Sequence, residues 1–392
     1  MMKKFSAQYI FDGKKLLQNA ILEVGDDGRI VSLTSDALNT REVNSLQMHS
    51  GIILPGLINM HQHLELAALQ GAIPQGIGLP GFIKEMADLR SSGTLHDAGL
   101  EKSRALDAIM YGQGIQAVLD ISNTVDTIEI KKTSQIYYHT MLEIFGVRPV
   151  DASTIWSSAQ QMLTCFSQSG LAAGISPHSL YALSQLLFNK LQLKPEALYS
   201  IHFMESMHEK EWLQEGSGEL GTLLQEKSKM FSQPKFHDLI SWLRDITKAS
   251  RLVMVHNTCV DREIVELLFN NLNRQEVYFC LCPQSNMYIE NTLPDIELLR
   301  KSGANIVIGT DSLASNSSTY FIDELKLLQR FNSNLSVVEI LTWSTSNAAR
   351  ALGLSHLLGS FVPNSKPGVV LLENINLAEM KLTNESRFRR LL

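Results

Sequence analysis

Residues 53–65 read ILPGLINMHQHLE, an apolar run that leads directly into His61 and His63. Side chains at positions i and i+2 of a β-strand point to the same side of the strand. If the run is a strand, its end presents two imidazole rings to one point, and imidazole is a common metal ligand. The stretch therefore predicts a metal site at the end of a buried strand.

The composition is that of an ordinary globular protein. The 392 residues are 44% hydrophobic, which is enough to bury a large core in two or three domains, or in one barrel with an appendage. The formal net charge of -6 argues against a nucleic-acid partner or an anionic membrane surface, because both favour clustered Lys and Arg. A small-molecule partner is therefore expected.

We expect the protein to be cytoplasmic. The segment MMKKFSAQYIFDGKK lacks an apolar run long enough for a signal peptide, and nowhere do about 18 apolar residues run uninterrupted, as a membrane span needs. The chain has too few cysteines for a disulfide framework, which fits a reducing compartment. They are Cys165, Cys259, Cys280 and Cys282.

Both ends of the chain are rich in strand signals. Residues 1–53 contain the alternating segments FSAQYIF, AILEVGDDGRIVSLTS and MHSGIIL, with a hairpin signal at Asp27-Gly28. Residues 361–392 contain VVLLEN and end in FRRLL. We expect the two ends to pair into one discontinuous β-sandwich domain, with the middle of the chain inserted between them.

Residues 54–360 show apolar strands that alternate with amphipathic helical segments, which is typical of βα units around a parallel sheet. Eight candidate strands occur: ILPGLINM, GIQAVLDI, YYHTMLEIF, LAAGISP, LYSIHFM, RLVMVHN, VYFCLCP and ANIVIGT. Eight units in roughly 250 to 300 residues match a (β/α)8 TIM-type barrel, so the predicted fold class is α/β. The active site of such a barrel lies at the C-terminal ends of its strands.

Side chains that bind metals or transfer protons stand at four of these strand ends. They are His61 and His63, then His202 with Glu205, then His256, and finally Asp311. Three imidazoles, a carboxylate and a water suit a divalent ion such as Zn²⁺ or Fe²⁺ in a catalytic site. A lone strand-end histidine is more often a hydrogen-bonded core residue, and Asp311 is compatible with a helix N-cap. The order of the whole set favours a metal site. Without a metal, each of these residues would need its own separate structural role at a strand end.

The motifs PGLINMHQH, IHFMES, VHN, CPQSN and GTDS occur in this order. Their order resembles the amidohydrolase superfamily, and within it the branch of cytosine deaminase, chlorohydrolase and S-adenosylhomocysteine deaminase-like enzymes. The resemblance covers nearly the whole chain, including the two-part β-sandwich. It implies one divalent metal, zinc with iron as the alternative, on His61, His63, His202 and Asp311. It also implies three catalytic residues: Glu205, His256 and Asp311.

The implied reaction is hydrolytic deamination. A bound metal lowers the pKa of its water from about 15.7 towards 7, so hydroxide is available at neutral pH. Asp311 takes the proton of the water, Glu205 protonates a ring nitrogen and then the departing amine, and His256 polarises the attacked group. The predicted substrate is an amino-substituted heterocycle, such as a purine or pyrimidine base or nucleoside, which loses ammonia.

The fourth strand bears on the number of metals. Other amidohydrolases hold two metals bridged by a carboxylated lysine at its end, but LAAGISPHSLY offers no lysine there, which favours one metal. The same segment places His178 in an SPH motif that resembles the substrate-facing histidine of the deaminase-like branch. A histidine hydrogen-bonded within its own loop is the alternative.

Further candidates for substrate contacts lie in loops at the same face. Residues 64–90 are rich in Gly and Pro before they turn helical, and long loops at this face shape or cover the pocket. An ordinary connecting loop and a surface arginine are the alternatives. The candidate pocket residues are Glu65, Gln70, Phe82, Ile83, Arg148 and Asn286. We interpret Cys280 and Cys282 as core residues, since no second pair completes a tetrahedral metal site.

Two other functions stay open. A chlorohydrolase-like or cyclic-amide hydrolase would use the same activated water on a different bond. A metal-free binding protein on the same barrel fits less well with the complete ligand set. Among deaminases, the aminofutalosine deaminases of the menaquinone route share this general pattern. The sequence does not decide the substrate, the native metal or whether the chain forms a homodimer.

Overall fold

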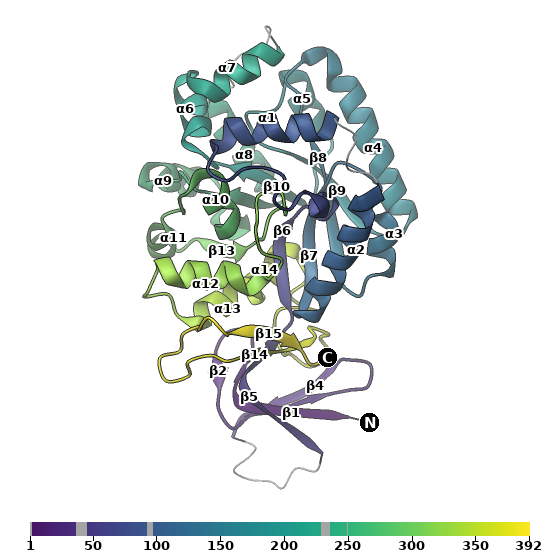
Figure 1. Cartoon of the computed structure of the whole chain (residues 1–392), viewed down its shortest axis with the longest axis vertical. Coiled ribbons are helices and arrows are strands. Elements are labelled where there is room, and N and C mark those ends of the chain that lie inside the picture. Colours follow the sequence, from purple (N-terminus) through teal and green to yellow (C-terminus); the bar gives the residue numbers. More distant parts are fainter. Residues whose placement is uncertain (1, 37–44, 92–96, 229–235, 249) are drawn as a thin grey trace.

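The computed structural model of the chain describes residues 2–36, 45–91, 97–228, 236–248 and 250–392. Its central part consists of eight parallel strands in two four-stranded sheets, with helices on the outside (Figure 1). The first sheet contains β6 (Leu57–Gln62), β7 (Ile115–Ser122), β8 (Tyr137–Ile144) and β9 (Ala172–Pro177). The second sheet contains β10 (Leu198–Phe203), β11 (Arg251–His256), β12 (Val277–Leu281) and β13 (Asn305–Ile308).

Backbone contacts join the two sheets along both seams. Ser179, just after β9, pairs in parallel with His202 of β10, and Gln62 of β6 pairs in parallel with Asp311, just after β13. The amides of Thr310 and Asp311 also donate to one carbonyl of β6, at 2.9 and 3.0 Å. These contacts bring the C-terminal ends of β6, β10 and β13 together.

The eight predicted strands are all present, with one difference. The predicted strand ILPGLINM is divided at Gly56, because β5 (Leu46–Pro55) ends before this glycine and β6 begins after it. A Cβ atom at Gly56 would collide with the carbonyl oxygen of Pro367, to which the amide of Gly56 donates at 2.8 Å. The glycine therefore permits the close contact at which the chain passes from one sheet to the other.

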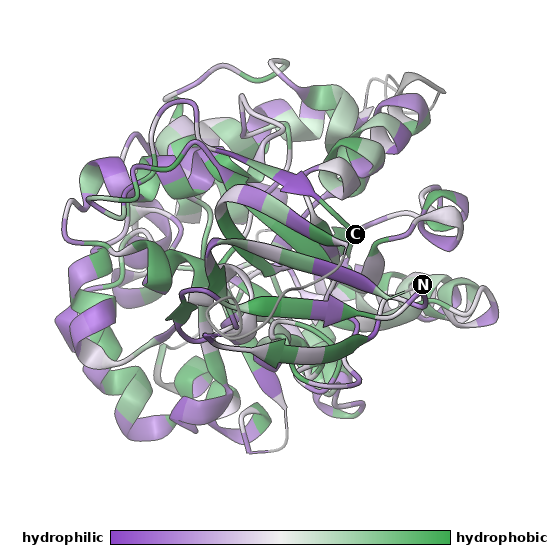
Figure 2. Ribbon diagram, turned by 90° about the horizontal axis from the view of Figure 1, so that it is seen from below, coloured by the Kyte–Doolittle hydropathy of each residue, from purple (hydrophilic) through white to green (hydrophobic). Residues whose placement is uncertain are grey.

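Both ends of the chain build one seven-stranded sheet, in the order β15-β14-β5-β1-β3-β4 with β2 paired to β1. β14 pairs antiparallel with β5, so the two ends lie side by side at the bottom of Figure 1. Seen from that side, the strands of this sheet carry both apolar and polar residues (Figure 2), as expected of a sheet with one buried face. The closure of this sheet into a two-layer sandwich stays a prediction. Besides β5, its strands are β1 (Lys3–Phe11), β2 (Leu16–Leu17), β3 (Ile21–Val24), β4 (Ile30–Thr34), β14 (Val369–Glu373) and β15 (Arg387–Arg390).

The helices pack apolar faces against the strands. In α12 the buried residues Phe321, Leu325 and Leu328 recur at the spacing of one helix face. A capping box between Ser336 and Glu339 fixes the start of α13. The α-helices are α1 (Gly78–Ser91), α2 (Asp97–Gly112), α3 (Ile128–Thr133), α4 (Ala152–Gln168), α5 (Gln185–Gln192), α6 (Met207–Glu215), α7 (Gly218–Lys227), α8 (Phe236–Ile246), α9 (Arg262–Asn271), α10 (Pro283–Glu290), α11 (Ile296–Ser302), α12 (Phe321–Phe331), α13 (Val337–Ser344) and α14 (Ser346–Leu352). In the described part of the chain, short 3-10 helices complete them: η2 (Leu64–Leu69), η3 (Pro149–Asp151) and η4 (Arg274–Glu276).

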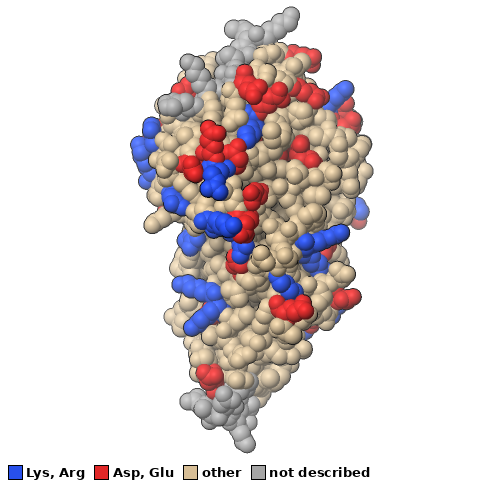
Figure 3. Space-filling model, turned by 90° about the vertical axis from the view of Figure 1, so that its left-hand side faces the viewer, with Lys and Arg blue, Asp and Glu red and all other residues tan. Residues whose placement is uncertain are grey.

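Apolar side chains of the parallel strands form an inner core together with α14. Cys280 and Cys282 belong to it, and both are fully buried free thiols, which confirms that they are core residues. On the face shown in Figure 3, acidic and basic side chains are interspersed, so this face has no uniform charge. Among the described residues, no helix combines the length and the apolar character needed to cross a bilayer.

Candidate metal centre and active site

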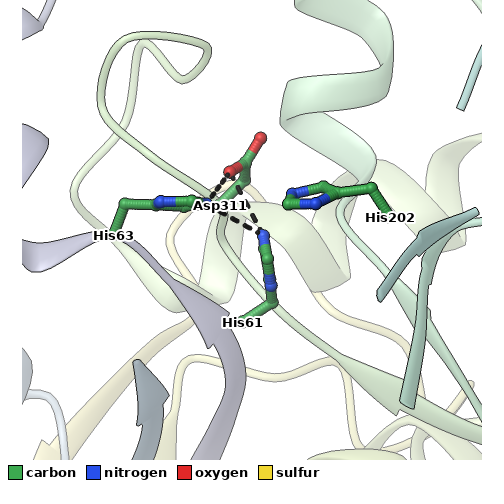
Figure 4. A group of neighbouring side chains, drawn as sticks. All are labelled: His61, His63, His202 and Asp311. Carbon is green, nitrogen blue, oxygen red and sulfur yellow. Dashed lines mark hydrogen bonds and ion pairs between the residues drawn. The ribbon is translucent and has the colours of Figure 1, made fainter. Parts of the chain in front are cut away.

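Four buried side chains converge at the C-terminal ends of β6, β10 and β13 (Figure 4): His61, His63, His202 and Asp311. The Nε2 atoms of His61 and His63 lie 3.2 Å apart, and Oδ1 of Asp311 lies 3.4 Å from each of them. Two ligand atoms bound tetrahedrally at about 2.0–2.1 Å from a metal are about 3.3 Å apart. The four side chains therefore fit a divalent metal ion.

Hydrogen bonds behind the ligands fix which atoms face the centre. Ser285 and Ser315 donate to Oδ2 of Asp311, at 2.6 and 2.8 Å, which leaves Oδ1 for the centre. Nδ1 of His202 donates to the carbonyl oxygen of His178 at 2.7 Å, which leaves Nε2 for the centre. Such partners orient metal ligands and raise their affinity for the metal.

The electrostatics of the centre favour the metal-binding forms of the ligands. Burial lowers the pKa of His63 to about 4, and it holds the pKa of His202 well below its usual value. Burial alone would raise the pKa of Asp311, but the hydrogen bond with His61 and the neighbouring histidines hold it well below its usual range. Neutral imidazoles beside an ionised carboxylate are the forms that bind a metal.

Glu205 and His256 lie beside the four ligands. Both side chains are buried, and Oε1 of Glu205 is 3.6 Å from Nε2 of His256. Burial, followed by the negative charge of Asp311, raises the pKa of Glu205 to about 8. In the metal-free protein Glu205 is therefore protonated at neutral pH, as a proton donor has to be.

The turn that carries Glu205 is held from two sides. Oε2 of Glu209 accepts the amide of Glu205 at 2.8 Å, while the hydroxyl of Ser206 accepts the amide of Glu209 at 3.1 Å and caps α6. The carbonyl of Met204, which has a positive φ of 48°, accepts the amide of Cys259 at 2.9 Å. These bonds fix the backbone from which the Glu205 side chain reaches towards His256.

A cavity of about 610 Å³ adjoins the centre, which is within the usual range for a small-molecule site. Its inner end is lined by His63, His202, Glu205, His256 and Asp311. The rest of the lining is mainly apolar and includes Phe82, Met86, Phe145, Val147, Ile155 and Leu224. The cavity therefore combines metal-binding side chains with mainly apolar walls.

The structure separates the predicted pocket residues into two groups. Phe82, Ile83, Arg148 and His178 line the cavity. The lining does not include Glu65, Gln70 and Asn286, and their contact with the substrate stays a prediction.

Glu65 turns its carboxylate away from the cavity towards β7. Its Oε2 accepts the hydroxyl of Ser122 at 2.5 Å and the amide of Asn123 at 3.0 Å. Burial raises its pKa to about 7, although these hydrogen bonds oppose the shift. The hydrogen bonds of Glu65 therefore connect η2 with the end of β7. Glu65 lines a different, smaller cavity of about 220 Å³.

Gln70 and Asn286 have similar local partners. The exposed Gln70 donates from Nε2 to the carbonyl oxygen of Ser317 at 2.9 Å. The side-chain amide of the buried Asn286 donates to the hydroxyl of Thr258. Gln70 connects the end of η2 with Ser317, and Asn286 connects α10 with the segment after β11. The sequence gives no signal for these partners, because they are distant along the chain.

Two buried carboxylates at strand ends are absent from the sequence-based site. Glu143 of β8 lines the cavity, and its Oε1 accepts Nδ1 of His178 at 2.6 Å. Asp120 of β7 accepts the amide of Leu64 at 3.0 Å and forms an ion pair of 2.6 Å with the buried Lys131. The signal for both in the sequence is a carboxylate near the C-terminal end of a predicted strand.

Comparisons with known proteins agree with this geometry. The profile described as the Amidohydrolase family matches residues 52–386. An adenosine deaminase of Helicobacter pylori is 23% identical over 355 residues, which cover 88% of this chain and 82% of the relative. An aminodeoxyfutalosine deaminase of Nitratiruptor sp. is 27% identical over 298 residues, which cover 71% of this chain and 67% of the relative.

Solved structures share the fold. Helicobacter pylori aminofutalosine deaminase in complex with methylthio-coformycin matches with a TM-score of 0.79 at 20% identity, over 97% of this chain and 93% of the other. An adenosine deaminase from Xanthomonas campestris with bound zinc matches with a TM-score of 0.70 at 18% identity, over 94% and 84%. The expected TIM-barrel type of fold, with its α/β content, is therefore confirmed.

Proposed function

Because the chain belongs to the amidohydrolase family of hydrolases, we propose that it is a mononuclear metal-dependent deaminase of amino-substituted heterocycles, above all of purine nucleosides. The observation that carries this proposal is the position of the buried Glu205, which lies 3.6 Å from His256 and lines one cavity with the metal-binding residues His63, His202 and Asp311. We also infer that the two parallel sheets form one closed barrel domain, residues 54–360. Residues 1–53 and 361–392 together form a discontinuous β-sandwich domain beside it.

One divalent ion, zinc in the first place and iron as the alternative, fits the centre. A related structure with bound zinc supports this choice, and the end of β9 has no lysine to bridge a second ion. When bound, the ion lowers the pKa of a bound water from about 15.7 towards 7 and so supplies hydroxide at neutral pH.

The chain's own residues then move the protons. Asp311 accepts the proton of the attacking water on Oδ1, since its other oxygen is occupied by two serine hydroxyls. Glu205 gives its proton to the ring nitrogen next to the attacked carbon. Of the two protons of the attacking water, one passes through Glu205 to the departing amine and the other, held in the meantime by Asp311, restores the proton of Glu205. His256, beside Glu205, holds the attacked group. Water and the amino compound thus become the oxo compound and ammonia.

The size and the walls of the cavity favour a substrate larger than a free base. The walls are mainly apolar, and the cations Arg90 and Lys227 also line the cavity, as does Arg148 in its ion pair with Asp151. A nucleoside with an apolar substituent that ends in a polar or anionic group matches this arrangement. Relatives named for adenosine, 5'-deoxyadenosine and aminodeoxyfutalosine belong to the same chemical class, and a nucleoside of the aminofutalosine type is our specific candidate.

The test is ammonia release from a panel of aminopurines, aminopyrimidines and their nucleosides. Glu205→Gln should keep its metal and lose at least about 100-fold in kcat, because general acid catalysis contributes about 10²–10⁴-fold. Glu215→Gln, on the exposed side of α6, is the matched control and should retain full activity. Full turnover by Glu205→Gln would refute the assignment of the proton donor. Chloride release or ring opening without ammonia would instead favour the other hydrolase functions.

A further inference from the structure

Glu324 is a buried carboxylate that has no part in the proton transfers described so far. It lies on α12 and is only 1% exposed. A buried carboxylate is costly unless hydrogen bonds satisfy it. Oε2 of Glu324 accepts the amide of Gln284 at 2.8 Å, and Oε1 accepts Nδ2 of Asn316 at 2.7 Å. One carboxylate therefore joins α12 to the start of α10 and to the segment after β13.

The two partners of this carboxylate are the direct chain neighbours of the two serines that contact Asp311. Gln284 precedes Ser285, and Asn316 follows Ser315. The hydroxyls of these serines donate to Oδ2 of Asp311, at 2.6 and 2.8 Å, and the two hydroxyl oxygens are 2.9 Å apart. The carboxylate on α12 thus holds both segments from which the serines reach Asp311.

The side chain of Asn316 has little freedom to turn. Its Nδ2 also donates to the carbonyl oxygen of Thr310 at 2.9 Å, and its Oδ1 accepts the amide of Ser318 at 2.9 Å. An exchange of the nitrogen and the oxygen of this amide would break these two hydrogen bonds and the one to Glu324. The donor therefore needs an oxygen of Glu324 in its present place.

A carboxylate in the first turn of a helix can also act simply through the helix dipole. Asp323, the preceding residue, has this simpler arrangement. It is half-buried, its Oδ2 accepts the hydroxyl of Ser318 at 2.6 Å just before the helix, and its Oδ1 is 3.5 Å from Nζ of Lys326 on the helix itself. Glu324 instead binds donors on other segments, so the two adjacent acids have different roles.

Replacing Glu324 by Gln would keep the shape of the side chain, but its NH2 group cannot accept a hydrogen bond. Either the amide of Gln284 or Nδ2 of Asn316 then loses its acceptor in the protein interior. A buried donor without an acceptor is costly, so the segment that carries it is expected to shift. A shift of either segment moves a serine hydroxyl away from Oδ2 of Asp311.

We propose that Glu324 is a positioning residue of the metal centre. It holds Ser285 and Ser315 in place, and these serines keep Oδ2 of Asp311 occupied and Oδ1 directed at the metal. The proposal rests on the metal centre of the proposed function and adds a residue that acts on this centre from outside the cavity lining.

The test measures zinc affinity by competition with a chromophoric chelator, and the visible absorption spectrum of the cobalt-substituted protein. Glu324→Gln should bind zinc about 10-fold more weakly, since outer partners of metal ligands contribute about 10- to 100-fold and Glu324 acts one step further out. Its cobalt spectrum should also differ from that of wild type, because this spectrum reports the ligand geometry. Asp323→Asn removes a charge from the same helical turn and can still accept the hydroxyl of Ser318, so it should match wild type in both measurements.

A combination of variants separates positioning from a general effect on stability. The Ser285→Ala/Ser315→Ala variant should itself bind zinc more weakly than wild type. Adding Glu324→Gln to it should weaken zinc binding no further, because Glu324 acts through the two serines. A second 10-fold loss in the triple variant, or wild-type zinc affinity in Glu324→Gln, would overturn the proposal.

If Glu324→Gln does not fold, Asn316→Ala removes one of the two partners and is measured in the same way. Lower zinc affinity and an altered cobalt spectrum are expected, and wild-type values would overturn the proposal. Neither measurement uses a substrate. Wild type that binds zinc but releases no ammonia from any compound of the panel would refute the deaminase function alone, whereas wild type that binds no zinc would refute both proposals.

Discussion

Replacing Glu209 by Gln should change how the stability of the protein depends on pH. Glu209 is fully buried in α6, and burial raises the pKa of its carboxyl group from 4.5 to about 8. One oxygen accepts the amide of Glu205, while Oε1 has no hydrogen-bond partner among the described residues. The folded protein therefore keeps this proton at neutral pH, whereas the unfolded chain releases it near pH 4.5.

The sign follows from the protons bound in each state. Between pH 4.5 and about 8 the folded state binds one more proton than the unfolded state, so this group's contribution to the free energy of unfolding falls as the pH rises. Each pH unit corresponds to about 1.36 kcal/mol, so the contribution of Glu209 falls by up to about 5 kcal/mol across this interval. Gln has no proton to release. The stability of Glu209→Gln relative to wild type should therefore increase steadily from pH 5 to pH 8.

Urea unfolding of zinc-loaded wild type, Glu209→Gln and Glu215→Gln at pH 5, 6, 7 and 8 measures this difference. Glu215 is exposed on the same helix, so its replacement should leave the pH dependence of wild type unchanged. The reasoning is refuted if Glu209→Gln and wild type lose stability in parallel as the pH rises.

Other perturbations test further parts of the structure. Gly309→Ala should lower zinc affinity in a competition titration, because the new Cβ would lie 2.6 Å from the Cβ of His61; unchanged affinity would contradict this. Lys131→Met should lower the free energy of unfolding by about 3–5 kcal/mol, because it leaves Asp120 buried without its ion-pair partner. Adding Asp120→Asn should recover part of that loss. A shortened chain of residues 54–360 should be insoluble or inactive, since it lacks Ile52, Val370 and Leu372, which belong to the main hydrophobic core; a folded, fully active one would contradict the domain arrangement.

The sequence was informative where a local pattern decides the structure. Short apolar runs identify strands, and a parallel barrel places all C-terminal strand ends at one face, so the sequence alone groups His61, His202 and Asp311. The division of one predicted strand at Gly56 could not be foreseen, because its cause is a contact with Pro367 at the other end of the chain.

The pocket wall was harder to predict, because the direction of a loop side chain depends on distant partners. Glu65 lies two residues after His63, yet it turns towards Ser122 at the end of the next strand and Asn123 just after it. Glu143 was missed because its partner, His178, follows a different strand. Only the assembled barrel brings these groups together.

The central claim is that the four converging ligands hold a metal on which deamination depends. The most direct measurement is ammonia release from purine nucleosides by one enzyme preparation as purified, after chelation, and after addition of one equivalent of zinc, with metal content determined at each stage. We predict about one bound ion per chain, loss of ammonia release with loss of the ion, and recovery with zinc. Ammonia release that persists in metal-free enzyme, or its absence with every nucleoside at full metal occupancy, would contradict the account.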